Sequence, residues 1–276
     1  MAGPNAVRLA PGSQNEYDGK VPNLFARRFC GQRFAGGLIF LLCAQAPAST
    51  PSPDWFARAW QSEDRLPNNT VGGIAQTADG YLWFGTPSGL VRFDGIRFEE
   101  FSPTNFVDAP YRGTELILRG HDGALWLAMD RGAVVCLNGN SSRAFTTNLP
   151  AIIPNGLAED AEGAVWVAYR LGSVYRIKDG QVTAFGKRDG LPEGESTDIC
   201  ALTTDARGRI WFAKAGQVGM VRDGVFQTLL HFEPAATRLA PARSGGVWFC
   251  SGFRLYKIEE NAQFQDFGEF HPERAG

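Results

Sequence analysis

The sequence predicts an all-β fold of the β-propeller class, with five four-stranded antiparallel blades, and three observations support this class. A segment centred on one tryptophan occurs five times in the chain. Successive copies are separated by 43, 40, 45 and 37 residues, which is a spacing typical of propeller blades. Each copy is bounded by turn residues and lacks the apolar spacing of a helix. Repeated short strands with this period favour blades over a helical solenoid.

The clearest copy of the repeated segment is DGYLWFGTPSGLVRFDG, residues 79–95. Asp-Gly pairs bound it, and a glycine-containing break separates its two apolar runs, which is the pattern of a β-hairpin. Five of the seven tryptophans in the chain occupy the same position of this repeat. These structural residues of the repeat are Trp83, Trp126, Trp166, Trp211 and Trp248.

The residues around each of these tryptophans follow one pattern. Glycine stands three positions before the tryptophan, an aliphatic residue directly before it, an apolar residue directly after it and a small residue one position later. Because side chains alternate between the faces of a strand, this strand is apolar on both faces and must be covered on both. We therefore expect an inner strand whose tryptophan packs between blades, where burial of each aromatic side chain contributes roughly 1.5–3 kcal/mol.

Three further strands complete each predicted blade. The strand before the tryptophan strand is expected at residues 71–76, 114–119, 155–159, 197–203 and 238–242. The strand after it is expected at residues 90–93, 134–137, 174–177, 218–221 and 254–258. The fourth strand is expected at residues 97–101, 143–145, 182–185, 226–229 and 264–267. The blades then span about residues 61–101, 111–145, 154–185, 196–229 and 236–267.

The segment before the first repeat bears on how the ring of blades closes. Residues 55–60, which include Trp55 and Trp60, have the composition of an outer strand without a blade of its own. The last repeat already has its own fourth strand at 264–267. We therefore expect this leftover strand beside five blades, and an incomplete ring of a seven-bladed design.

Leu-Pro pairs before the predicted first strands add a family pattern. They occur in EDRLPNNTV (63–71), NLP (148–150) and RDGLPEGESTDI (188–199). Together with the hairpin at 79–95, these segments resemble the two-component regulator propeller repeat over about residues 55–267. The resemblance implies the periplasmic sensing region of a hybrid two-component sensor histidine kinase. Further repeats, a β-sandwich module, a membrane span and a kinase usually follow in that family, so signal transduction by phosphorelay is expected to reside outside this chain.

The N-terminal region predicts export. Residues 27–48 place arginines before an apolar run and then small residues, which is the layout of a secretory signal peptide. The apolar run is shorter than the roughly 20 residues that a membrane-spanning helix needs, although an uncleaved anchor is the alternative. Residues 1–26 are an unmatched extension, 49–54 a linker and 268–276 a tail. A bacterial periplasmic location follows.

Charge and cysteine content exclude several classes of function. The 27 basic and 29 acidic residues are scattered, so nucleic acid is not an expected partner. Outside the signal peptide the cysteines are Cys136, Cys200 and Cys250, whose spacing fits no zinc site. We expect buried thiols, no metal and no cofactor. His121 falls in a repeat turn and is expected to be a solvated turn residue.

Function is expected where the repeats differ, because no catalytic triad, phosphate loop or metal spacing is present. In propellers the loops between second and third strands, and those between blades, surround the opening of the central channel. Basic and aromatic side chains there suit a carbohydrate or a small anionic ligand. The candidate ligand-binding residues are Arg131, Tyr169, Arg170, Lys214, Tyr111 and Arg112. A non-catalytic ligand sensor is therefore predicted, with membrane sensor-kinase components as partners; a protein-binding scaffold and a propeller polysaccharide lyase or glycosidase are the alternatives.

Overall fold

The computed structural model describes residues 58–101, 113–139, 141–194, 199–233 and 237–270. Within these ranges the chain forms twenty strands and two short 3-10 turns, η1 (Ser62–Asp64) and η3 (Lys187–Asp189). None of the helical turns in this part of the chain has the length and hydropathy needed to cross a bilayer. The expected extension, signal peptide and linker lie outside the described residues.

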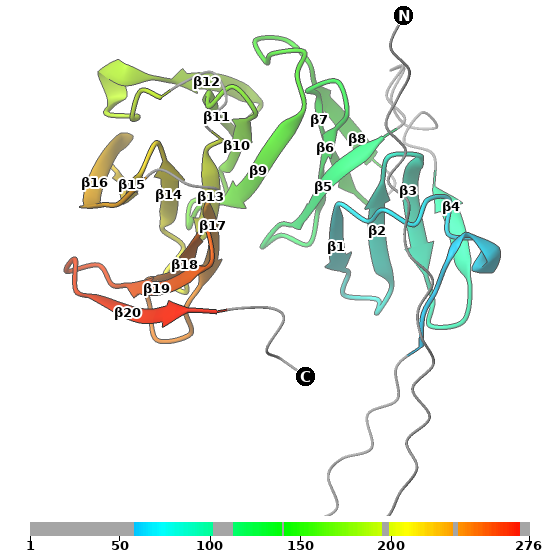
Figure 1. The fold of residues 1–276 in the computed structure, drawn as a ribbon. Helices are drawn as coiled ribbons and strands as arrows, with labels where there is room; N and C mark the ends of the chain where they lie inside the picture. Colours follow the sequence, from blue (N-terminus) through cyan, green and yellow to red (C-terminus); the bar gives the residue numbers. More distant parts are fainter. Residues whose placement is uncertain (1–57, 102–112, 140, 195–198, 234–236, 271–276) are drawn as a thin grey trace, which may run out of the picture. The chain divides into compact units, whose positions relative to one another are not determined.

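The strands form five separate four-stranded sheets (Figure 1). Blade 1 contains β1 (Gly73–Gln76), β2 (Leu82–Thr86), β3 (Gly89–Phe93) and β4 (Phe98–Phe101). Blade 2 contains β5 (Thr114–Arg119), β6 (Leu125–Met129), β7 (Val134–Asn138) and β8 (Ser141–Phe145). Blade 3 contains β9 (Pro154–Glu159), β10 (Val165–Tyr169), β11 (Val174–Lys178) and β12 (Gln181–Phe185). Blade 4 contains β13 (Ala201–Thr204), β14 (Ile210–Lys214), β15 (Gln217–Arg222) and β16 (Val225–His231). Blade 5 contains β17 (Thr237–Pro241), β18 (Val247–Ser251), β19 (Arg254–Ile258) and β20 (Phe264–Glu269).

Each sheet is antiparallel with its strands in chain order, which confirms the predicted fold class. The turn between the first and second strands of each blade depends on the glycine three positions before the tryptophan. This glycine has a positive φ in all five copies, for example 89° at Gly80 and 97° at Gly245. Glycine adopts that conformation without the steric cost that a Cβ imposes, so the repeat keeps it there.

Four of the five repeated tryptophans pack between blades, as predicted, and Trp248 instead contacts Phe267 of its own sheet. Trp211 on β14 is fully buried and lies in one apolar cluster with Val247 and Phe249 of β18. The same arrangement joins blades 1 and 2 through Trp83, and blades 3 and 4 through Trp166. These clusters make each blade depend on its neighbour for a core, since one four-stranded sheet cannot cover both of its own apolar faces.

The first strands of successive blades lie side by side. Contacts join β1 to β5, β5 to β9, β9 to β13 and β13 to β17. The approach is close at Gly73, where an added Cβ would lie only 2.8 Å from the backbone nitrogen of Ile117. No comparable packing joins β17 back to β1 in the described residues, so the blades form an open ring.

The expectation of a leftover outer strand at 55–60 is wrong for its described part. Residues 58–60 form no strand. The ring of Trp60 instead packs edge-on against Phe93 and Phe98 of blade 1, with centroids 4.9 and 5.8 Å away. The described residues contain no blade before blade 1, and Trp60 with Leu66 covers the apolar face that such a blade would cover. Burial of that face explains why this segment does not pair as a strand. Trp55 lies outside the described residues.

Candidate functional site

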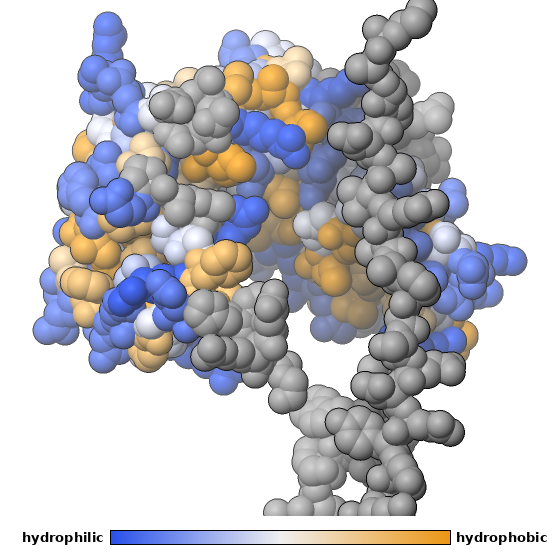
Figure 2. All heavy atoms as spheres, viewed as in Figure 1, coloured by the Kyte–Doolittle hydropathy of each residue, from blue (hydrophilic) through white to orange (hydrophobic). Residues whose placement is uncertain are grey.

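A cavity of about 700 Å³ lies where the first strands of the blades meet, and it is called the channel cavity below. Its wall includes residues of β5, β9, β13 and β17, together with the loop between β10 and β11. Figure 2 shows apolar and hydrophilic side chains next to each other around the hollow between the sheets. The polar or charged side chains in its described lining belong to Glu115, Asn155, Arg170 and Arg238.

Two of these side chains come from equivalent irregularities in neighbouring strands. Pairing of β5 with β6 shifts register between Thr114 and Leu116, which leaves Glu115 without a partner residue. Pairing of β9 with β10 skips Asn155 in the same way. A β-bulge of this kind re-aims the side chain of the extra residue and is common beside functional sites. The bulges therefore give the channel cavity a carboxylate and an amide from adjacent blades.

The amide of Asn155 is fixed on one side and free on the other. Its Nδ2 donates a hydrogen bond to the carbonyl oxygen of Cys200 on the next blade, at 2.9 Å. Its Oδ1 is buried and has no hydrogen-bond partner in the described residues. An unpaired buried acceptor costs about 1–3 kcal/mol, which a donor group on a bound molecule would recover.

The charged side chains of the cavity form few contacts with the described residues. The backbone nitrogen of Arg170 donates to the carbonyl of Ile153 at 3.2 Å, but within the described ranges its guanidinium has no hydrogen bond or ion pair. Among the described residues, Arg238 donates to the neighbouring carbonyl of Thr237, at 3.2 Å. The Glu115 carboxylate has no partner among the residues that the structure describes. All three groups are available to a ligand.

Arg131, Tyr111 and Arg112 belong to the same predicted set of ligand residues. Arg131 is exposed in the loop between β6 and β7 and does not line the channel cavity in the described structure. Tyr111 and Arg112 lie outside the described residues. Of the described members of the set, Arg170 alone lines this cavity.

The expectation that Tyr169 and Lys214 extend into the opening is wrong. Tyr169 is fully buried, and its hydroxyl donates to the carbonyl of Gly132 on the preceding blade at 2.6 Å. Burial raises the pKa of Tyr169 well above its usual range. Lys214 is 9% exposed, and its Nζ donates to the carbonyl of Pro192 at 2.6 Å. Each is the last residue of a second strand rather than a loop residue, so both side chains are used within the fold.

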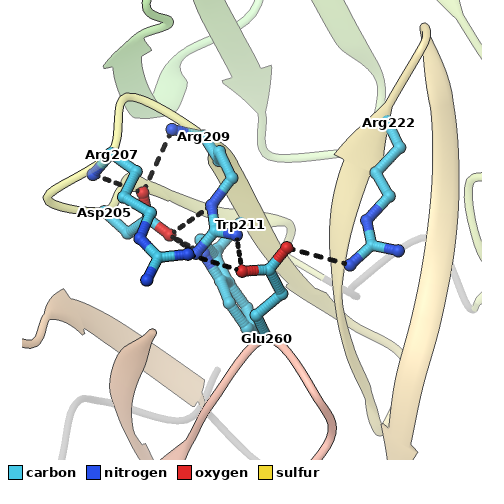
Figure 3. A network of polar contacts seen from close by, with 6 residues as sticks. All are labelled: Asp205, Arg207, Arg209, Trp211, Arg222 and Glu260. Carbon is cyan, nitrogen blue, oxygen red and sulfur yellow. Dashed lines mark hydrogen bonds and ion pairs between the residues drawn. The ribbon is translucent and has the colours of Figure 1, made fainter. Parts of the chain in front are cut away.

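The opposite ends of the blades carry a group of ion pairs that joins blades 4 and 5 (Figure 3). This turn-end network consists of Asp205, Arg207, Arg209, Trp211, Arg222 and Glu260. Asp205 accepts hydrogen bonds from Trp211 Nε1 at 2.8 Å and from Arg209 Nη2 at 2.6 Å. Glu260 of blade 5 pairs with Arg209, with Arg207 at 2.9 Å and with Arg222 at 3.6 Å.

The carboxylates of the turn-end network are held in their charged form. Burial alone would raise the pKa of Asp205, but hydrogen bonds from Arg209 and Trp211 lower it below its ordinary value. A hydrogen bond from Arg209 likewise lowers the pKa of Glu260. Because these groups already satisfy one another across the blade boundary, the network serves to hold blade 5 on blade 4.

The buried aspartates at these turns were not identified from the sequence. The indole nitrogens of Trp166 and Trp211 both donate at 2.8 Å to an aspartate six positions earlier, Asp160 and Asp205. In blade 1 the equivalent acceptor is Thr77, at 3.0 Å. The pattern Asp/Thr-x-x-Gly-x-x-Trp occurs in three of the five copies and was visible in the sequence.

In the described residues, the cysteines and His121 form neither a disulfide nor a cluster of metal ligands. Cys136, Cys200 and Cys250 are free thiols, and burial raises the pKa of Cys136 to about 11 and that of Cys200 to about 12. His121 is exposed, and its backbone nitrogen donates to the carboxylate of Glu159 at 2.8 Å. No cluster of three or more potential metal ligands occurs in the described part of the chain.

Comparison with solved structures places the fold among propellers. The chain is similar to a structure described as streptogramin B lyase, with a TM-score of 0.62 and 18% identity over 75% of this chain and 71% of that one. It is similar to virginiamycin B lyase from Staphylococcus aureus, with a TM-score of 0.61 and 16% identity over 73% of this chain and 71% of that one. It is also similar to a structure described as the extracellular domain of a hybrid two component system from B. thetaiotaomicron, with a TM-score of 0.57 and 17% identity.

That last likeness covers 73% of this chain and spans 28% of the extracellular-domain chain. No curated protein matches the sequence. The family model for the two component regulator propeller matches residues 65–88, which form the Leu-Pro segment and first hairpin of blade 1. This match agrees with the resemblance of the repeats to the two-component regulator propeller repeat, and the likeness to solved structures shows the propeller fold.

Proposed function

We propose that this chain is an exported, non-catalytic sensor propeller that binds a small ligand in the channel cavity. The observation that carries the proposal is the pair of equivalent bulges, which turn Glu115 and Asn155 toward a cavity of about 700 Å³. Arg170 and Arg238 add positive charge to the same wall. Small-molecule sites in proteins are cavities of this size with a few polar groups set in an apolar lining.

The comparisons support a sensor function rather than catalysis. The matching family model is that of the two component regulator propeller. The lyase structures and the extracellular domain of a hybrid two component system share the fold at 16–18% identity, which supports no shared reaction or ligand. Binding needs placed charges and an apolar wall, and the channel cavity supplies both.

Ligand binding is expected to depend on Arg170 and not on Arg131. Both arginines are exposed in the loop between the second and third strands of a blade, but only Arg170 lines the channel cavity. Replacing Arg170 with alanine removes a charge-assisted hydrogen bond worth about 1.5–3 kcal/mol, so affinity should fall at least tenfold. The measurement is the ligand-induced thermal shift of parent, Arg170→Ala and Arg131→Ala proteins across a small-molecule library.

Both variants should fold like the parent, because exposed loop substitutions change stability by less than about 0.5 kcal/mol. The proposal is abandoned if Arg170→Ala and Asn155→Ala both keep every ligand-induced shift of the parent. Loss of the shift in Arg131→Ala alone would place the site at a different loop.

Export is tested separately, at the N-terminus. The arginines, apolar run and small residues of 27–48 favour cleavage after Ala46 or Ala48. N-terminal sequencing of periplasmic protein should therefore give a sequence that begins at residue 47 or 49. Periplasmic material that begins at Met1 would contradict cleavage.

A further inference from the structure

We infer that the ligand of the channel cavity is an amphipathic organic acid, with an apolar body, one carboxylate and a hydrogen-bond donor, and not a sugar. This inference rests on the proposed function and names the chemical class for the same site. It follows from three features of the described lining: its apolar residues, its lack of aromatic faces and the balance of its charges.

The apolar residues of the cavity come from several elements, and two of them are exposed. Leu116, Leu202 and Leu239 contribute from β5, β13 and β17. Leu171 and Ile199 line the same cavity while 60% and 43% exposed. Large apolar side chains left in water around a concave surface favour a ligand that buries carbon against them.

Sugar rings are usually held by aromatic side chains, whose flat faces match the C–H face of the ring. No tryptophan, tyrosine or phenylalanine belongs to the described lining. The repeat tryptophans are used for packing within and between blades, as at Trp166 and Trp211. A sugar also needs a partner for each hydroxyl that it buries, and four polar side chains in a largely aliphatic wall supply few.

The charges of the lining define the polar part of the ligand. Among the described residues of the lining, Arg170 and Arg238 carry positive charge and Glu115 carries negative charge, which gives this part of the wall one positive charge in excess. A guanidinium matches a carboxylate geometrically because it presents parallel N–H donors. The Glu115 carboxylate and the unpaired Oδ1 of Asn155 are hydrogen-bond acceptors. A ligand with a hydroxyl or amino group could donate hydrogen bonds to them. Arg170 directly precedes Leu171 in the chain, so the residue that would bind the ligand's carboxylate is next to one that would contact its apolar body.

The test compares molecules that differ in one feature, by calorimetric titration of the full chain. The probe 4-hydroxyphenylacetate has the apolar body, the carboxylate and the donor. Its amide lacks the charge, phenylacetate lacks the hydroxyl, and glycolate lacks the apolar body. We expect 4-hydroxyphenylacetate to bind at least tenfold more tightly than each of the other three. Cellobiose and a sulfated disaccharide represent sugars and should not compete.

Two cavity variants and one control localise the effect. Arg238→Gln should abolish the preference for the acid over its amide. Leu171→Ser should weaken 4-hydroxyphenylacetate severalfold, whereas the control Ile96→Ser, at a residue 79% exposed outside the cavity lining, should not. Binding of a disaccharide that Arg170→Ala abolishes would overturn the ligand class while the proposed function stands. Binding of no probe, or binding that ignores both arginines, would overturn the ligand class and the proposed function together.

Discussion

Replacing Trp211 with alanine is expected to lower the free energy of unfolding by about 3–5 kcal/mol, the usual cost of removing a large aromatic side chain from a core. The ring is fully buried between blades 4 and 5, where Val247 and Phe249 pack on it. Its indole nitrogen also donates to buried Asp205, which would lose that hydrogen bond. Chemical denaturation followed by circular dichroism measures the loss.

The matched control is Trp248→Ala, at the same repeat position of blade 5. Trp248 is half-buried and contacts Phe267 of its own sheet, with ring centroids 4.9 Å apart. The residue six positions earlier is Ala242, so the aspartate acceptor found in blade 4 is missing. We expect a loss of about 1–2 kcal/mol, because part of the Trp248 side chain is already exposed to solvent. Equal losses for the two variants would show that the blade boundary does not stabilise Trp211.

The comparison of Trp211 with Trp248 also shows why the fold was predictable from the sequence. A strand that is apolar on both faces must lie between two layers, and five copies in register predict five blades. The strands β5 and β19 begin and end at the residues that were predicted. Alternation along the strand and glycine at the turn are local properties, so the chain displays them before it folds.

The candidate site was less predictable, because it depends on where pairing between strands shifts. Glu115 and Asn155 face the channel cavity through bulges, and a bulge is a property of two strands together. Tyr169 was assigned to a loop because no sequence signal marks where β10 ends. In the structure β10 includes Tyr169 as its last residue, and its side chain is buried. Arg170, one position later, was predicted correctly as a loop residue at the opening.

In the proposed sensor, the turn end of the blades therefore contributes stability and the channel cavity binds the ligand. At one end, Asp205 pairs with Arg209 within blade 4, Glu260 pairs with the same arginine across the blade boundary, and both pairs contribute stability. In the channel cavity, Arg170 and Glu115 have no partner among the described residues. Substitutions at the turns should consequently change stability without changing ligand preference, and substitutions in the cavity should do the reverse.

Removal of the Asp205 carboxylate should destabilise the protein strongly and in a way that depends on pH. Asp205→Ala leaves the buried indole nitrogen of Trp211 without an acceptor and takes one of the two carboxylates from Arg209. Breaking a buried ion pair costs about 3–5 kcal/mol, and the lower value is expected here because Arg209 keeps Glu260. Asp223→Asn, an exposed turn aspartate of the same blade, is the control and should change stability by less than about 0.5 kcal/mol.

The pH dependence of unfolding distinguishes the stabilisation due to the charge of Asp205 from that due to its hydrogen-bond geometry. Its pKa is lower in the folded protein than the ordinary value near 4, so its stabilisation is complete above about pH 4 and is lost as the pH falls through the folded pKa. Asp205→Asn cannot titrate, so its stability deficit should be largest near neutral pH and should shrink as the pH falls below about 4. Urea denaturation at a series of pH values measures this deficit. A deficit that stays constant from pH 7 to pH 2.5 would show that the hydrogen-bond geometry, and not the charge, stabilises the boundary between blades 4 and 5.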